Sequence, residues 1–199
     1  ASNDEELIAF VTRKLLKGLP ITVTAPVLSC STFNAVTPAG EFIFGRNFDM
    51  DYSPAVLIHT KPDNGYESIS MANLAFLGYT DNYLPDQFFD KFLALAAPYV
   101  PLDGINEKGL AVGILLLPDT PPTRQETGKI NINSTTAIRM LLDRAATVDE
   151  AIAMLKEYDM HDSANSCFHY QITDAAGNSV IIEYVNNEMQ ALKPEATYQ

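Results

Sequence analysis

Two short runs of apolar residues most constrain how this chain can fold. Residues 42–44 and 110–117 are apolar without the alternation of polar and apolar side chains that marks a strand with one face in water. A strand that is apolar throughout is typical of a layer covered on both faces. The longer run is also less than half of the ~20 residues that a membrane-spanning helix needs. We therefore expect both runs to be strands inside a layered core, and no membrane-spanning segment.

Outside these runs, helical spacing and strand-like alternation succeed one another along the chain. Ser2 and Glu5 form a capping-box pattern ahead of a helical apolar spacing that stops before Gly18, so we expect the chain to open with a helix. Strands, then helices, then strands predict an α+β layered fold in one domain. The predicted strands are residues 30–36, 41–49, 56–60, 68–72, 168–173, 179–185 and 188–192, and the predicted helices are 2–18, 86–97, one from 134 and one from 147.

Composition excludes several partners. The 199 residues carry a formal net charge of −12, whereas nucleic-acid and anionic membrane surfaces require clustered Lys and Arg. Cys30 and Cys167 are the only two cysteines, which excludes a disulfide framework but leaves one bridge conceivable. No spacing of acidic residues matches a calcium loop. We expect no nucleic-acid partner, no cofactor and no metal.

Cys30 is the candidate nucleophile. It opens a strand-like segment and is followed sixteen positions later by Arg46 and, three further on, by Asp49. A thiol with a pKa of about 8.5 is mostly protonated at neutral pH, whereas an α-amine with a pKa of about 7.7 to 8.0 can serve as a base. If the chain were cut immediately before Cys30, one residue would carry both nucleophile and base. Attack on an amide carbonyl would then give an oxyanion and a thioester acyl-enzyme.

The motifs after Cys30 follow one another over most of the remaining chain. They are CSTF at residues 30–33, GRNFDMD at 45–51, DGINEKGLAVG at 103–113, TTAIR at 135–139 followed by ATVDEA, and HYQITDAAGNSVIIEY at 169–184. In this order and spacing they resemble the choloylglycine hydrolase family of N-terminal nucleophile hydrolases, which includes bile salt hydrolases, penicillin V acylases and other linear amide hydrolases. The resemblance implies a four-layer αββα sandwich that cleaves a linear carbon–nitrogen amide bond.

The same resemblance implies roles for three further residues. Asp49 would orient the freed amine, and Arg46 would hold the thiolate electrostatically. Asn106 would help to bind the oxyanion. Each residue also has a structural interpretation: Arg46 and Asp49 could form an ion pair, and Asn106 could belong to a turn.

Two other functions stay open on the residues alone. Cys30 could pair with a histidine such as His169 in a thiol hydrolase that needs no processing. The chain could also be a non-catalytic binding module on the same scaffold. By its surroundings, His169 is expected to pack between neighbours on a strand, and Cys167 is expected to pack in the core.

Because a segment precedes Cys30, the intact chain lacks the free amine that this active site would need. In the intact chain the amine of Cys30 is tied up in its peptide bond with Ser29. We interpret residues 1–29 as a propeptide-like segment and residues 30–199 as the hydrolase domain. Our hypothesis is that Cys30 attacks the Ser29 carbonyl and cuts itself free.

The C-terminal end of the chain also differs from what the family resemblance implies. The chain stops at Gln199, where the family is expected to continue through a strand with a second oxyanion-hole asparagine and, later, an arginine. We therefore expect a sandwich incomplete at its C-terminus, whose uncovered faces associate with the missing part or form a homo-oligomer. Loops at 56–60, 76–84 and 118–131 would frame an apolar pocket for a small-molecule N-acyl amide of open identity. The compartment also stays open, with an extracytoplasmic one slightly favoured.

Overall fold

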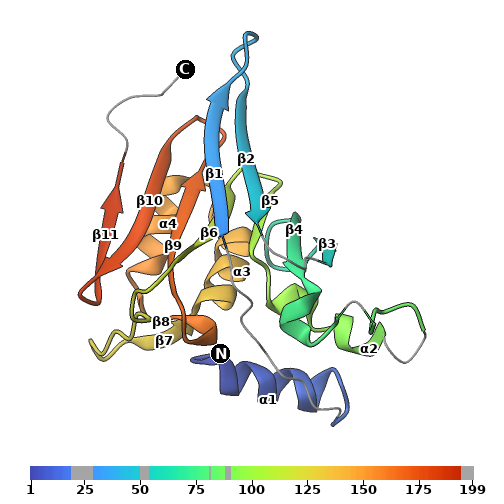
Figure 1. The fold of residues 1–199 in the computed structure, drawn as a ribbon. Coiled ribbons are helices and arrows are strands. Elements are labelled where there is room, and N and C mark those ends of the chain that lie inside the picture. The colour runs from blue at the N-terminus through green and yellow to red at the C-terminus, as the bar shows by residue number, and fades with distance from the viewer. Residues whose placement is uncertain (19–28, 50–53, 81, 88–90, 194–199) are drawn as a thin grey trace.

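The computed structural model describes residues 1–18, 29–49, 54–80, 82–87 and 91–193, and it shows stacked layers with a long hairpin extending beyond them (Figure 1). The helices are α1 Asp4–Lys14, α2 Lys91–Ala94, α3 Ser134–Arg144 and α4 Val148–Leu155, with short 3-10 turns η1 Leu74–Leu77, η2 Ala97–Tyr99 and η3 Ser163–Asn165. The strands are β1 Ser29–Val36, β2 Phe42–Asp49, β3 Ala55–Thr60, β4 Ser68–Asn73, β5 Asp103–Asn106, β6 Ala111–Leu117, β7 Ile130–Asn133, β8 Tyr158–His161, β9 Cys167–Thr173, β10 Ser179–Val185 and β11 Glu188–Leu192.

The central layer is a seven-stranded sheet in the order β11-β10-β9-β6-β5-β4-β3. Its neighbouring strands are antiparallel, and β6 lies in the middle between β5 and β9. Leu110 and Val112 have no exposed surface. The prediction that residues 110–117 form a buried strand is therefore confirmed. The first half of the run is covered by a neighbouring strand on each side and by packed layers on both faces.

Helices α3 and α4 cover one face of this sheet (Figure 1). Ala137, Ile138 and Leu141 recur at helical spacing on α3 and are fully buried in the main hydrophobic core. Helix α4 begins after Thr147, whose hydroxyl accepts the backbone N–H of Glu150 at 3.2 Å. These two helices are the layer that the sequence predicted from residue 134 onward.

Strands β1 and β2 form an antiparallel hairpin against the opposite face of the sheet. Its inner side chains approach the sheet closely at Gly113, where an added Cβ would lie 3.1 Å from the Phe44 ring and 3.3 Å from the methyl group of Thr32. Glycine at this position therefore allows the two layers to meet. Helices, central sheet and hairpin stack in the order of an αββα sandwich, with the hairpin in the second sheet layer.

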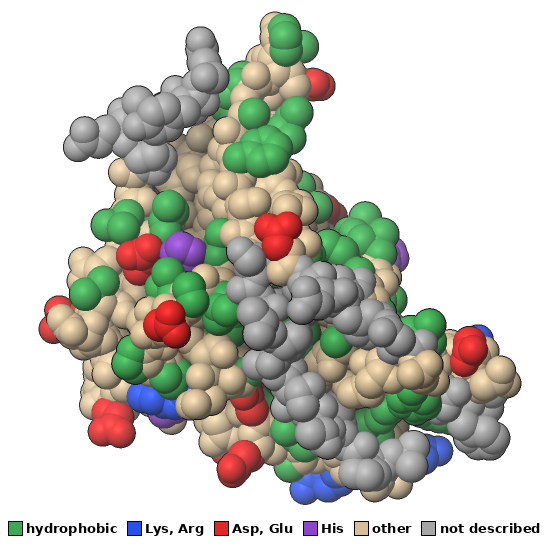
Figure 2. Space-filling model, viewed as in Figure 1, with side chains coloured by type: hydrophobic (Ala, Val, Ile, Leu, Met, Phe, Trp, Pro, Cys, Tyr) green, Lys and Arg blue, Asp and Glu red, His purple; other side chains and the backbone are tan. Residues whose placement is uncertain are grey.

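The outer face of the hairpin carries exposed apolar side chains, which appear at the top of Figure 2. Phe33 is 59% exposed and Ile43 is 44% exposed. The prediction that residues 42–44 are covered on both faces is therefore wrong for the part of the chain that the structure describes. Phe44 packs toward the sheet, but within these residues no layer covers the other side of the hairpin. Association through this face stays a prediction.

Three local predictions also differ from the structure. The helix predicted at residues 86–97 is reduced to α2 and η2, with residues 88–90 outside the described part. Helix α1 is capped by Asn3 rather than Ser2, because Asn3 has extended backbone and its side chain accepts the N–H of Glu6 at 2.9 Å. The parallel pair of β7 and β8 was not predicted: both strands alternate apolar and polar residues, but each is only four residues long, which is too short for the alternation to stand out.

Candidate active site

The hairpin brings Cys30 and Arg46 onto one face. Cys30 pairs with Phe48, and Arg46 pairs with Thr32 two positions along, so alternation directs these side chains inward together. The Nη2 atom of Arg46 lies 3.5 Å from Sγ of Cys30. The sixteen-residue spacing in the sequence thus becomes a contact through one turn and an antiparallel register.

Arg46 is held in place by a partner from another layer. Its Nε donates to Oδ2 of Asp103 at 3.2 Å, and the two side chains are only 7% and 11% exposed. The guanidinium also lies 4.3 Å from the ring centroid of Phe48. Its Nη1 is buried and has no hydrogen-bond partner among the described residues. Arg46 therefore has a nitrogen whose N–H donors no described residue uses.

The thiol of Cys30 is not preactivated in the intact chain. Burial raises its pKa above the ordinary value. The positive charge and the N–H of Arg46 oppose this shift, as does the backbone N–H of Leu116, whereas the negative charge of Asp49 adds to it. The thiol is therefore protonated at neutral pH and needs a base before it can attack a carbonyl.

Asp49 lies at the end of β2, opposite Ser29. Its side chain is exposed, and Oδ1 accepts the side-chain amide of Asn47 at 2.6 Å. The register therefore places Asp49 opposite the residue whose carbonyl is joined to the nitrogen of Cys30. Its role in orienting that nitrogen as a free amine stays a prediction.

Asn106 lies at the other end of β5 from Asp103, and its hydrogen bonds within the described chain do not reach Cys30 or Arg46. Its buried amide group makes four hydrogen bonds, which hold the tight turn after β5 against the end of α3. The side chain donates to the carbonyls of Leu142 at 3.0 Å and Ala145 at 2.8 Å. These contacts favour the turn interpretation, and the oxyanion role stays a prediction.

Asn106→Ala is expected to lower the free energy of unfolding by about 2–4 kcal/mol, because buried backbone groups would lose their partners. Urea unfolding measures this loss, and Asn64→Ala, in an exposed turn, is the matched control. An Asn106→Ala protein as stable as the control but without turnover would contradict the structural role and favour the oxyanion role.

None of the three histidines is hydrogen-bonded to Cys30 in the described structure. His169 Nδ1 lies 3.1 Å from Oε1 of Glu183, while His161 and His59 bond to other groups. Cys167 is buried, and both cysteines are free thiols. The described residues contain no cluster of side chains suited to a metal ion, and none of their helices is long and apolar enough to cross a bilayer.

A groove of about 270 Å³ runs beside the ion pair of Arg46 and Asp103. Of the three segments expected to frame an acyl pocket, only residues 56–60 contribute to it, and they form strand β3 rather than a loop. Residues 76–84 and 118–131 do not line it, with residue 81 outside the described part. The apolar side chains that line it are Phe44, Leu57, Ile69, Met71, Ile105 and Ala111.

Sequence reasoning missed two groups at this site. Asp103 was noticed only as the first residue of a motif, although its carboxylate anchors Arg46. The backbone N–H of Leu116, which opposes the rise in the pKa of Cys30, has no side-chain pattern that could report it. A buried arginine next to a nucleophile is a signal that a carboxylate must lie nearby, because burying an unpaired charge is costly. That rule predicts a partner but not which of 25 acidic residues it is.

The stacking of helices, central sheet and hairpin defines an αββα sandwich, with a cysteine near the start of the hairpin. A model of the linear amide C–N hydrolases, choloylglycine hydrolase family, matches residues 30–196. The chain belongs to this family, and the match begins at Cys30.

Two relatives support this assignment. The chain is 28% identical over 171 residues to a bile salt hydrolase/transferase of Clostridium perfringens, covering 80% of this chain and 49% of the relative. It is 31% identical over 107 residues to a penicillin V acylase of Pectobacterium atrosepticum, covering 49% of this chain and 28% of the relative. The chain thus spans half or less of the length of these relatives.

Solved structures show the same fold. A variant of conjugated bile acid hydrolase from Clostridium perfringens superposes with a TM-score of 0.60 at 21% identity, over 82% of this chain and 51% of that one. Penicillin V acylase from Agrobacterium tumefaciens superposes with a TM-score of 0.50 at 17% identity, over 81% and 49% of the two chains. The fold class predicted from the sequence is confirmed.

Proposed function

We propose that this chain is the precursor form of a cysteine N-terminal nucleophile amidohydrolase, which cleaves a linear amide through a thioester at Cys30. One observation carries the proposal. The buried ion pair with Asp103 holds the Arg46 guanidinium 3.5 Å from the Cys30 sulfur, at the residue where the family match begins.

Maturation would use the same thiol. Sγ of Cys30 attacks the carbonyl carbon of Ser29, the carbon–nitrogen bond breaks, and the freed amine takes up the thiol proton. The Ser29 acyl group is then held as a thioester on Cys30. Water hydrolyses this thioester, which gives a carboxylate on Ser29 and a chain that begins with the free amine and thiol of Cys30.

In the mature chain the amine supplies the base that the buried thiol lacks. It accepts the thiol proton, and the thiolate attacks the amide carbonyl of the substrate. The oxyanion needs preorganised donors, and the unpartnered Nη1 of Arg46 is a candidate. The proton passes to the leaving amine, and water releases the acid from the acyl-enzyme. Asp49 would orient the amine, and Asn106 would bind the oxyanion only if its amide released the carbonyls of Leu142 and Ala145.

The proposed substrate class is a small-molecule N-acyl amide with an apolar acyl group. The relatives are named for penicillin V and for bile salts, which share a linear amide between an apolar acyl group and an amine. The groove beside Arg46 is lined mainly by apolar side chains, which suits such an acyl group.

The acyl-enzyme provides the test. Protein expressed to its natural C-terminus is mixed with a phenoxyacetyl amide or a glycine-conjugated bile acid, quenched in acid and digested. We expect the peptide beginning at Cys30 to gain the mass of the acyl group and to lose it with hydroxylamine, as a thioester does. Turnover that persists after alkylation of Cys30, without any such adduct, would refute the proposal.

A further inference from the structure

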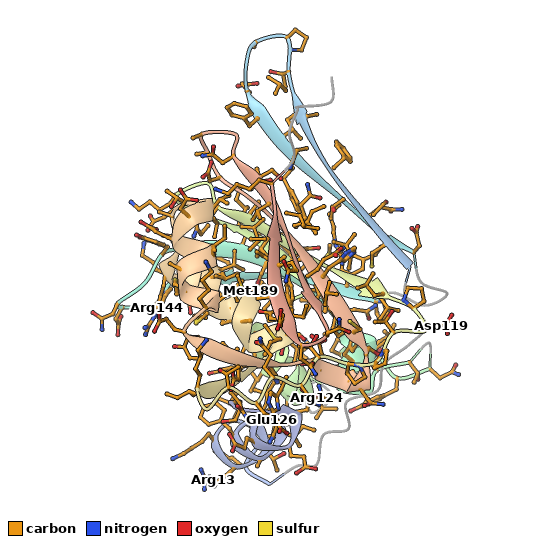
Figure 3. The ribbon with its side chains drawn as sticks, turned by 90° about the vertical axis from the view of Figure 1, so that its left-hand side faces the viewer. Arg13, Asp119, Arg124, Glu126, Arg144 and Met189 are labelled. Carbon is orange, nitrogen blue, oxygen red and sulfur yellow. The ribbon has the colours of Figure 1, made fainter. Side chains whose placement is uncertain are left out.

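Helix α1 belongs to a hydrophobic core of the folded protein. Leu7, Val11 and Leu16 are 5%, 2% and 2% exposed, respectively. Leu7 and Val11 lie one turn apart on one face of α1, Leu16 follows the end of the helix, and all three pack with buried residues of η1, η2 and β3 in the second hydrophobic core. Helix α1 lies along the base of the molecule in Figure 1. Figure 3 shows it nearly end-on, with Arg13 pointing away from the body.

Polar contacts also hold α1 to the body. Oδ1 of Asp4 accepts the side-chain amide of Asn133 at 2.9 Å, and Oδ2 accepts the backbone N–H of Ala164 at 2.7 Å. Ala164 has a φ of 54°, in the left-handed region that non-glycine residues rarely adopt. Asp4 thus satisfies a donor in an unfavourable turn, which would otherwise need another acceptor.

The first turn of α1 also closes a cavity. Asp4 and Leu7 form one wall of a small, largely apolar cavity of about 30 Å³. The opposite walls come from the central sheet and from η1, through Ile114, Phe168 and Phe76. Removing α1 would expose this lining to water, which is unfavourable for apolar surface.

We propose that the N-terminal segment is a retained subunit rather than a discarded propeptide: after cleavage before Cys30 it stays bound through α1 as a second, non-covalently associated chain. The proposal rests on the proposed maturation. Cutting one peptide bond removes the tether but leaves the buried face of α1, the two hydrogen bonds of Asp4 and the cavity wall in place.

The test cleaves the chain with an added protease, so that it does not depend on the chemistry of Cys30. A site for a specific protease replaces part of residues 19–28 in the Cys30→Ala protein, expressed to its natural C-terminus and cleaved after folding. Size-exclusion chromatography with intact mass detection is expected to show both fragments in one peak at equal amounts, which separate only in denaturant. A body that elutes folded and without its N-terminal fragment would overturn the proposal. Because the engineered cut replaces self-cleavage, a failure of self-cleavage in the wild type would refute the proposed self-maturation without affecting this result.

A pair of helix variants sharpens the test. Val11→Asp puts a carboxylate into the buried face of α1, whereas Ala9→Asp puts the same group on its exposed face. We expect Val11→Asp to weaken retention by roughly 100-fold or more and Ala9→Asp to leave it unchanged. If Val11→Asp fails to fold, Asp4→Asn is the milder variant, and it is expected to speed release of the fragment by roughly tenfold. Equal release from the buried-face and exposed-face variants would contradict the proposal.

Discussion

Replacing Cys30 by alanine is expected to leave the bond between Ser29 and Cys30 intact and to lower amide hydrolysis by more than about 10³-fold. Without the sulfur there is no nucleophile for either the Ser29 carbonyl or the substrate carbonyl. Intact mass and N-terminal sequencing report the cleavage, and product formation reports turnover.

Cys167→Ala is the matched control for this variant, because Cys167 is a free, buried cysteine on β9 that the mechanism does not use. It is expected to be cleaved and to hydrolyse amides as the wild type does. Cleavage of the Cys30→Ala protein at the same bond would show that another protease matures the chain. Full turnover in cleaved Cys30→Ala protein would rule out Cys30 as the nucleophile.

Arg46→Met is expected to reduce the free energy of unfolding by about 3–5 kcal/mol, the usual cost of leaving one partner of a buried ion pair alone. The carboxylate of Asp103 would stay buried without its cation, and the contact between the guanidinium and Phe48 would also be lost. Urea unfolding at neutral pH measures the loss. The Arg46→Met, Asp103→Asn double variant is expected to recover part of it, because no unpaired charge remains.

The loss should also depend on pH in a definite direction. Burial raises the pKa of Asp103 above its ordinary value, and Arg46 limits that rise. An acid whose pKa is raised by folding contributes stability below its unfolded pKa and loses it as the pH rises through the folded pKa. Removing Arg46 raises this folded pKa further, so the deficit of Arg46→Met should shrink as the pH falls and Asp103 becomes protonated. A deficit that is constant with pH and unchanged by Asp103→Asn would instead reflect lost packing on Phe48.

Most of the secondary structure followed from local pattern. The run at residues 110–117 and the helical spacing of Ala137, Ile138 and Leu141 report which faces are buried, and that information lies within a few residues. Pattern failed at residues 42–44. An apolar run shows that a strand tends to be covered, but it cannot show whether the covering layer lies within the same stretch of chain.

In the candidate site, too, some features followed from local sequence and others did not. Cys30 and Arg46 could be predicted together, because a hairpin turn and a fixed register link them over sixteen positions. The sequence also suggested Asn106, but not that its amide is engaged by the end of α3.

By itself, the sequence determined the family and the α+β class, and it predicted Cys30 as the nucleophile, since these depend on motifs and on local periodicity. Only the tertiary structure decided that Asp103 anchors Arg46, that burial raises the pKa of the Cys30 thiol, and that α1 is part of a core. The physical reason is that burial, and with it the pKa of a thiol or the need for a counter-charge, depends on which distant strands and helices become neighbours. Local periodicity sets which face of an element is buried, whereas the order of strands in the sheet sets what that face meets.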